Sequence, residues 1–117
     1  MTITRIDSGP RMSDALVHGG KVYLSGYVAE AAAGKPVREQ TADILAQIEE
    51  TLTRVGSDKT KLLKTNIWLT DISTITEMNA VWDAWVVPGH TPVRATVEAR
   101  LAQPQWAVEI MVEAAIG

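Results

Sequence analysis

The stretch between Pro36 and Gly56 constrains the fold most, because it is the longest segment with a clear helical period. Apolar residues recur there three and four positions apart, with charged residues between them. The pattern predicts an amphipathic helix that begins after Pro36 and ends at Gly56. The apolar stripe of this helix consists of Ile44, Leu45, Ile48, Leu52 and Val55.

Most other patterned segments have the alternation or the β-branched composition of strands. Gly19-Gly20 joins two of them in the manner of a tight hairpin. A second helix is predicted over residues 73–86, where Thr74 and Glu77 have the spacing of a capping box. Strands are predicted over residues 2–7, 15–18, 22–28, 62–69, 91–100 and 106–115. Strand runs with two separated helices predict an α+β domain in which both helices pack on one face of the sheet.

Length and composition narrow the classes of function. The chain has 117 residues, which predicts a single domain over residues 1–117. Its net charge of −3 disfavours a nucleic acid as partner. It has no cysteine, and His18 and His90 lack the spacing of metal ligands, so we expect no metal site. No apolar run approaches the length of a membrane span, and we expect a cytoplasmic protein.

Arg94 is the first candidate for a functional residue, because it lies in a strand-like run that begins at Thr91-Pro92. An arginine held on a rigid strand suits a planar ligand with two oxygens, such as a carboxylate. Alternation places Arg94, Thr96, Glu98 and Arg100 on one face of that strand. The alternative is that this face is simply polar and solvated over an apolar core.

Glu109 is the second candidate, on the last predicted strand. A short connection between the last two strands predicts an antiparallel pair, and a hairpin centred between Leu101 and Ala102 places Glu109 opposite Arg94. The two residues then form a cross-strand ion pair, or Arg94 binds a substrate carboxylate while Glu109 positions water. The sequence pattern leaves both hypotheses open.

Several motifs together resemble the RidA/YjgF family, the reactive intermediate deaminases that are also labelled L-PSP endoribonuclease-like proteins. Residues 89–94, with Trp82-Asp83-Ala84-Trp85-Val86 before them, resemble the YoaB-type branch in particular. The resemblance runs nearly from end to end. Its motifs are Tyr23-Leu24-Ser25-Gly26, Lys64-Thr65-Asn66-Ile67-Trp68-Leu69-Thr70-Asp71, Met78-Asn79, Thr91-Pro92-Val93-Arg94 and Val108-Glu109-Ile110.

The resemblance implies a chorismate-mutase-like fold of the bacillus type, in which three copies form a trimeric barrel with clefts between subunits. In that family an arginine binds the carboxylate of a 2-imino or 2-enamino acid, and a glutamate holds the attacking water. These positions match Arg94 and Glu109, while Ser25, Gly26 and Asn79 match residues that line the same cleft. The implied reaction releases a 2-keto acid and ammonia and needs no cofactor.

The chain departs from the family pattern at the rim of the expected pocket. Arg11-Met12 stands where the family has a tyrosine, Tyr27 replaces a glutamine, and Ala95-Thr96 replaces Ser-Cys. We expect Tyr27 and Thr96 to contact the substrate. Three hypotheses follow: a deaminase of small 2-imino acids, a non-catalytic protein that binds 2-keto acids or similar carboxylates, and a ribonuclease or translation inhibitor. The acidic composition weighs against the third.

Overall fold

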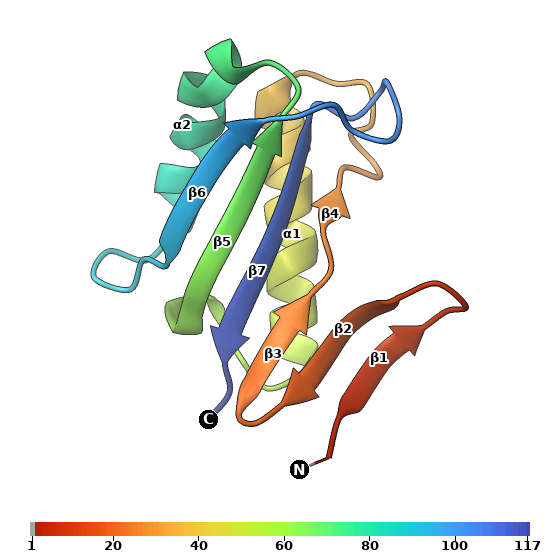
Figure 1. Cartoon of the computed structure of the whole chain (residues 1–117). Helices are drawn as coiled ribbons and strands as arrows, with labels where there is room; N and C mark the ends of the chain where they lie inside the picture. Colours follow the sequence, from red (N-terminus) through yellow and green to blue (C-terminus); the bar gives the residue numbers. More distant parts are fainter. Residues whose placement is uncertain (1) are drawn as a thin grey trace.

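The computed structural model describes residues 2–117 and consists of one mixed sheet with two helices on the same face (Figure 1). This confirms the predicted α+β architecture. Within these residues, neither helix is long and apolar enough to cross a membrane. The elements are β1 (Thr4–Ser8), β2 (Ser13–His18), β3 (Lys21–Leu24), β4 (Tyr27–Val28), α1 (Val37–Arg54), the 3-10 turn η1 (Lys59–Lys61), β5 (Leu62–Leu69), the 3-10 turn η2 (Ile72–Thr74), α2 (Ile75–Trp85), β6 (Val93–Glu98) and β7 (Val108–Ala115).

The strand order corrects one prediction. The order is β1-β2-β3-β7-β5-β6, with β4 also beside β7, and only β5 and β6 run parallel. The predicted hairpin between the last two strands is therefore wrong, because β5 lies between them. The connecting loop crosses the end of β5, where Ala99 N donates to Leu69 O (2.9 Å) and Thr70 N donates to Ala107 O (3.0 Å).

The local predictions around glycine and proline are confirmed. The first helix begins at Val37, directly after Pro36, and ends at Arg54, two residues before Gly56. Gly19 and Gly20 form the turn of the β2–β3 hairpin with φ values of 61° and 78°, which suit a two-residue hairpin turn. Glycine and proline act on the φ angles of their own backbone, so their effects on turns and helix ends do not depend on where the element lies in the fold.

Gln40 is one of the polar residues on the buried side of α1. Gln40 is buried, and its Nε2 donates to the carbonyl oxygens of Lys35 (2.8 Å) and Gln105 (3.0 Å). Its Oε1 accepts a hydrogen bond from Ala107 N (2.9 Å). Gln40 therefore joins α1 to the loop that precedes β7, and both N–H groups and the oxygen of its amide have hydrogen-bond partners.

The start of α2 differs from the predicted capping box. Thr74 forms no side-chain cap and instead donates through Oγ1 to Asp71 O (2.6 Å). The carboxylate of Asp71 accepts hydrogen bonds from the amide and hydroxyl of Ser73. The chain therefore enters α2 through the 3-10 turn η2, because Asp71 caps that turn first and the α-helix begins only at Ile75.

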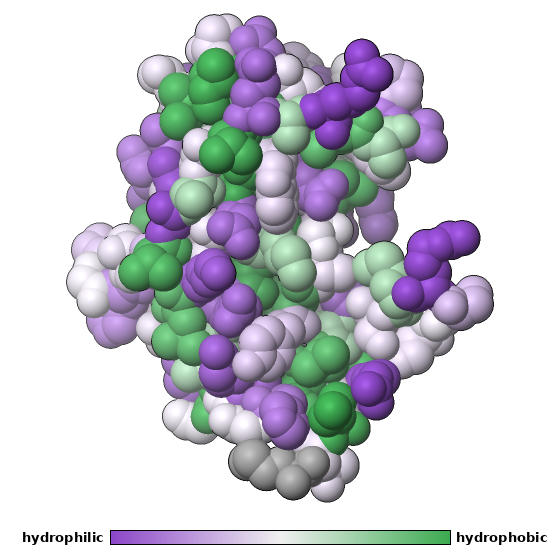
Figure 2. Space-filling view, viewed as in Figure 1, coloured by the Kyte–Doolittle hydropathy of each residue, from purple (hydrophilic) through white to green (hydrophobic). Residues whose placement is uncertain are grey.

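The alternation in β6 suggests that its apolar side faces the core and its polar side faces solvent. In the structure the apolar side of β6 is the one that the helices leave uncovered. Its apolar residues Val93 and Val97 are 70% and 50% exposed, on the face that no helix covers. Arg94 and Thr96 point to the helix-covered side. We call the uncovered side the open face of the sheet, and it is turned toward the viewer in Figures 1 and 2. Figure 2 shows hydrophobic residues exposed among polar ones on this face.

Candidate functional site

Arg94 lies at the edge of the helix-covered face. It is the direct partner of Thr65 on β5, which in turn pairs with the buried Val112 on β7, and direct partners share a face of the sheet. The guanidinium carbon of Arg94 lies 5.4 Å from the ring centroid of Trp82 on α2. This cation–π contact orients the guanidinium plane while the side chain stays exposed, which leaves its N–H groups free to bind a carboxylate.

Three oxygen atoms on the elements around Arg94 are buried without a hydrogen-bond partner among residues 2–117. They are Thr65 Oγ1, Thr96 Oγ1 and Asn79 Oδ1. Thr65 is the partner of Arg94 across the sheet, and Thr96 is two residues farther along β6 on the same face. Asn79 precedes Trp82 by about one helical turn on α2. Buried oxygens without a partner are uncommon in folded proteins, and three of them lie on the elements around Arg94.

Glu109 lies on the open face. Its direct partner on β5 is Trp68, which in turn pairs with the exposed Val97 on β6. Its neighbours along β7, Val108 and Ile110, point into the core under the helices. Burial raises the pKa of the Glu109 carboxyl above its usual range.

Ser25 and Gly26 form a bulge beside Glu109. Tyr23 pairs with Glu113 and Tyr27 pairs with Ile110, so three residues, 24–26, lie opposite two residues of β7. The amide of Ser25 turns away from β7 and donates to Asp14 O (2.9 Å). A Cβ atom at position 26 would collide with Oε2 of Glu109, so only glycine lets this carboxylate lie against the backbone.

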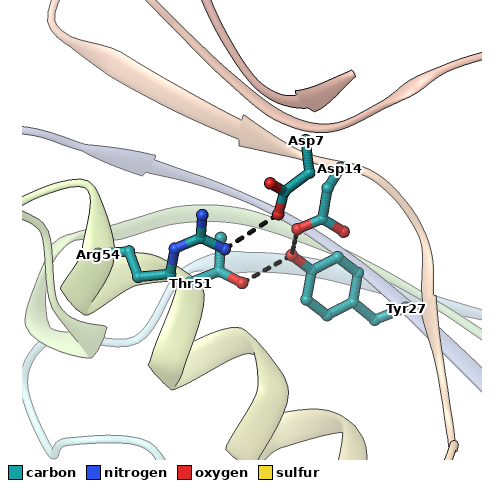
Figure 3. Close-up of polar contacts among 5 residues, drawn as sticks. All are labelled: Asp7, Asp14, Tyr27, Thr51 and Arg54. Atoms are coloured by element: carbon teal, nitrogen blue, oxygen red, sulfur yellow. Dashed lines mark hydrogen bonds and ion pairs between the residues drawn. The ribbon is translucent and has the colours of Figure 1, made fainter. Parts of the chain in front are cut away.

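Tyr27, which we expected to contact substrate, lies on the other side of the sheet. Its hydroxyl donates to Asp14 Oδ2 (2.8 Å) and lies 2.8 Å from Thr51 Oγ1 on α1 (Figure 3). Burial raises the pKa of this hydroxyl. Asp14 therefore holds both neighbours of Gly26, Ser25 through its backbone and Tyr27 through its carboxylate. Beside this cluster, Arg54 bonds to Asp7 at 3.1 Å.

The predicted site residues thus form two groups. The arginine group consists of Arg94, Thr96 and Asn79, with Thr65 as a member that the sequence motifs did not single out. The glutamate group consists of Glu109, Ser25 and Gly26. Because the two groups lie on opposite faces of the sheet, Arg94 and Glu109 of one chain cannot hold the same small molecule. Among residues 2–117, no three His, Cys, Asp or Glu side chains are placed to bind a metal ion.

The whole chain matches a known protein family. A family model described as Endoribonuclease L-PSP matches residues 2–116. The chain belongs to this family. RutC family protein YoaB of Escherichia coli is 45% identical over 116 residues, which are 99% of this chain and 100% of the relative. A RutC family protein of Haemophilus ducreyi is 40% identical over 114 residues, or 97% of each chain.

Solved structures of this family share the fold. A YjgF-family protein of Neisseria meningitidis is 48% identical and superimposes with a TM-score of 0.96, over 100% of this chain and 97% of that chain. A member of the YjgF/YER057c/UK114 family from Mycobacterium tuberculosis is 28% identical, with a TM-score of 0.87 over 98% of this chain and 100% of that chain. These matches confirm the predicted membership of the RidA/YjgF family and its arrangement of two helices on a mixed sheet.

Proposed function

We propose that this member of the Endoribonuclease L-PSP family hydrolyses small 2-imino acids to 2-keto acids and ammonia. The observation that carries the proposal is the setting of Glu109. Its carboxylate is partly buried against the backbone of Gly26 on a face that the helices leave open, and burial raises its pKa. A carboxylate in such a setting can hold a water molecule and accept its proton at a pH nearer neutrality than usual.

The arginine group supplies the binding half of the proposed site. The guanidinium of Arg94 can donate two parallel hydrogen bonds to the carboxylate of an imino acid. Trp82 restricts its orientation, and the unpaired oxygens of Asn79 and Thr96 lie buried on the elements around it. Fixing the carboxylate places the imine carbon at a defined distance from Arg94, which is a large part of the catalytic effect expected of this site.

The reaction needs one water and no external oxidant or reductant. The oxygen of water bonds to the carbon of the protonated imine while Glu109 accepts a proton, and the electron pair of the C=N double bond moves to nitrogen, which becomes an amine. Glu109 then returns its proton to this nitrogen, the carbon–nitrogen bond breaks, and ammonia leaves while the hydroxyl group gives its proton back to Glu109 and becomes the keto oxygen. Because Arg94 and Glu109 lie on opposite faces in one chain, the proposed site takes Arg94 from one copy and Glu109 from a second. We propose a homotrimer as this assembly.

The proposal is tested by supplying an imine from an amino-acid oxidase and measuring how fast 2-keto acid and ammonia appear. The wild-type protein should accelerate the release, and Arg94→Ala should lower kcat/KM by about 100-fold or more. Arg94→Lys is the matched control, because it keeps the charge but loses the two-pronged geometry, and it should fall between the two. Equal acceleration by wild type and Arg94→Ala would contradict the proposal.

The altered rim favours one other function. With the hydroxyl of Tyr27 bonded under α1 and Met12 on the β1–β2 turn, the rim differs from that of the family pattern. A protein that binds 2-keto acids without chemistry would keep Arg94 and lack turnover. Calorimetry with pyruvate that detects binding lost in Arg94→Ala, together with no acceleration of imine hydrolysis, would favour it. RNA cleavage is not proposed, because the net charge of −3 does not suit a polyanion.

A further inference from the structure

A cavity of about 410 Å³ opens beside the glutamate group. Its size lies within the range of ligand pockets in proteins. Residues of β2, β3, β7 and the two adjoining turns form its walls. Among the wall residues are Met12, Leu16, Tyr23, Ser25, Gly26 and Met111.

The walls away from Glu109 are mainly apolar. Leu16 and Tyr23 are direct partners on β2 and β3, so their side chains lie next to each other. Met12 and Met111 are 55% and 39% exposed, so both side chains are accessible to a ligand in the cavity. Methionine adapts its shape easily, so these two residues can close around ligands of different form.

Gly26 connects this cavity to the proposed site of reaction. Its backbone lies against Oε2 of Glu109 and also forms part of the cavity wall. Met111 is two residues from Glu109 on the same face of β7, and it belongs to the wall as well. A molecule whose imine carbon lies over Glu109 therefore has the cavity within reach of the substituent on that carbon.

We propose that this cavity receives the side chain of the 2-imino acid and selects flexible apolar side chains of leucine or methionine size. This inference rests on the proposed function and names the substrate class of the same site. A methyl group leaves most of the cavity empty and gains little from its apolar walls. A carboxylate side chain loses its hydration there without an opposite charge among Met12, Leu16, Tyr23 and Met111. Both are therefore poorer substrates.

The test compares kcat/KM for imines that an oxidase produces from leucine, methionine and alanine. In the wild-type protein, the leucine and methionine imines should exceed the alanine imine by about tenfold or more. A ratio near one or below would overturn the inference. The oxidase is kept in excess, so that its own preference does not limit the rate.

Two variants locate the selectivity in the cavity. Met12→Ala removes a wall on an exposed turn and should lower the ratio several-fold, because the leucine and methionine imines lose more contact with the cavity than the alanine imine does. Leu16→Phe fills the cavity and should favour the alanine imine. Ile72→Ala is the matched control, since Ile72 is 40% exposed and lies outside the cavity, and it should leave the ratio unchanged. An unchanged ratio in both cavity variants would also overturn the inference.

A binding measurement separates failure of this inference from failure of the proposed function. Calorimetry compares 4-methyl-2-oxopentanoate with pyruvate, and neither needs turnover. If 4-methyl-2-oxopentanoate binds more tightly than pyruvate and Met12→Ala abolishes this difference, the cavity selects apolar side chains. This result supports the inference even when no imine is hydrolysed, and only the proposed deaminase activity then fails. Equal binding of the two acids, or no binding of either, overturns the inference whatever the rate of imine hydrolysis.

Discussion

The two faces of the sheet are built from the same strands but are covered differently. Under the helices, Val108, Ile110 and Val112 of β7 are almost fully buried. On the open face, Val93 and Val97 of β6 are exposed. The covered face completes its core within one chain, whereas the open face leaves apolar side chains in water.

The difference bears on function because each face carries one group of candidate residues. The arginine group lies at the edge of the covered face, where Trp82 on α2 orients Arg94. The glutamate group lies on the open face, where Gly26 lets Glu109 lie against the backbone. One chain can thus prepare both groups but cannot bring them to one ligand, and burying the open face against another copy would do so.

The largest effect is expected when the two groups are inactivated in different chains. Arg94→Ala and Glu109→Gln should each be nearly inactive in the imine assay. In a ring of mixed subunits, a site is intact when a Glu109→Gln chain supplies Arg94 and an Arg94→Ala chain supplies Glu109. Random mixing of equal amounts should therefore restore about a quarter of the wild-type activity.

Refolding the two variants together and separately is the measurement for this prediction. The separately refolded variants are the control, and they should stay inactive when combined without exchange of subunits. If both variants are inactive alone and no activity returns after verified mixing, Arg94 and Glu109 do not meet across an interface.

The second effect concerns the open face itself. Val97→Lys places a charge on the exposed apolar row of β6 and should prevent assembly, because a charge buried in an apolar interface is costly. Light scattering at micromolar concentration should give the mass of one chain, and imine hydrolysis should be lost with it. Asp83→Lys is the control on exposed α2 and should assemble as the wild type does. A monomeric wild-type protein would contradict this prediction.

The third effect concerns the covered face. Gln40→Leu should lower the free energy of unfolding by about 1–3 kcal/mol, since it removes the bonds to the carbonyls of Lys35 and Gln105 and leaves the amide of Ala107 without its side-chain partner. Denaturant unfolding measures the change. Arg38→Leu, at an exposed position of the same helix, should change the value by less than about 0.5 kcal/mol. Similar losses in both variants would show that the Gln40 bonds matter little.

What could be predicted from the sequence was mostly local. Pro36, Gly56 and the Gly19-Gly20 turn fixed the limits of α1 and the first hairpin, because these residues act on their own backbone. The strand that pairs with the last strand, β7, could not be predicted from local patterns. The loop after β6 crosses the end of β5, and no pattern near Arg94 or Glu109 indicates that crossing.

The same distinction holds within the candidate site. Alternation separated Arg94 from Val93 correctly but could not tell which side the helices would cover, so the apolar side of β6 proved to be the exposed one. The orientation of Tyr27 depends on the bulge at Ser25-Gly26, which exchanges the faces of the residues that follow it. A motif can name a position without fixing the face on which its side chain lies.

The smallest effect is a dependence on pH that comes from Glu109. Burial raises the pKa of this carboxyl in the folded protein, so between the ordinary and the raised value the folded state holds a proton that the unfolded state has released. The free energy of unfolding should therefore fall as the pH rises through this window. Glu109→Gln removes this ionisation. The unfolding free energy of the variant relative to wild type should therefore increase with pH up to the raised pKa and stay constant at higher pH.

The proposed activity should change in the opposite direction over the same window. Glu109 must be ionised to accept a proton from water, so kcat/KM should rise with pH as this carboxyl loses its proton. Denaturant unfolding of wild type and Glu109→Gln, together with the pH profile of wild-type kcat/KM, reports the pKa of this carboxyl in the free protein in two ways. If burial on the open face sets this pKa, the two midpoints agree. If the difference in unfolding free energy between wild type and Glu109→Gln does not vary with pH, a raised pKa of Glu109 explains neither the stability nor the activity profile.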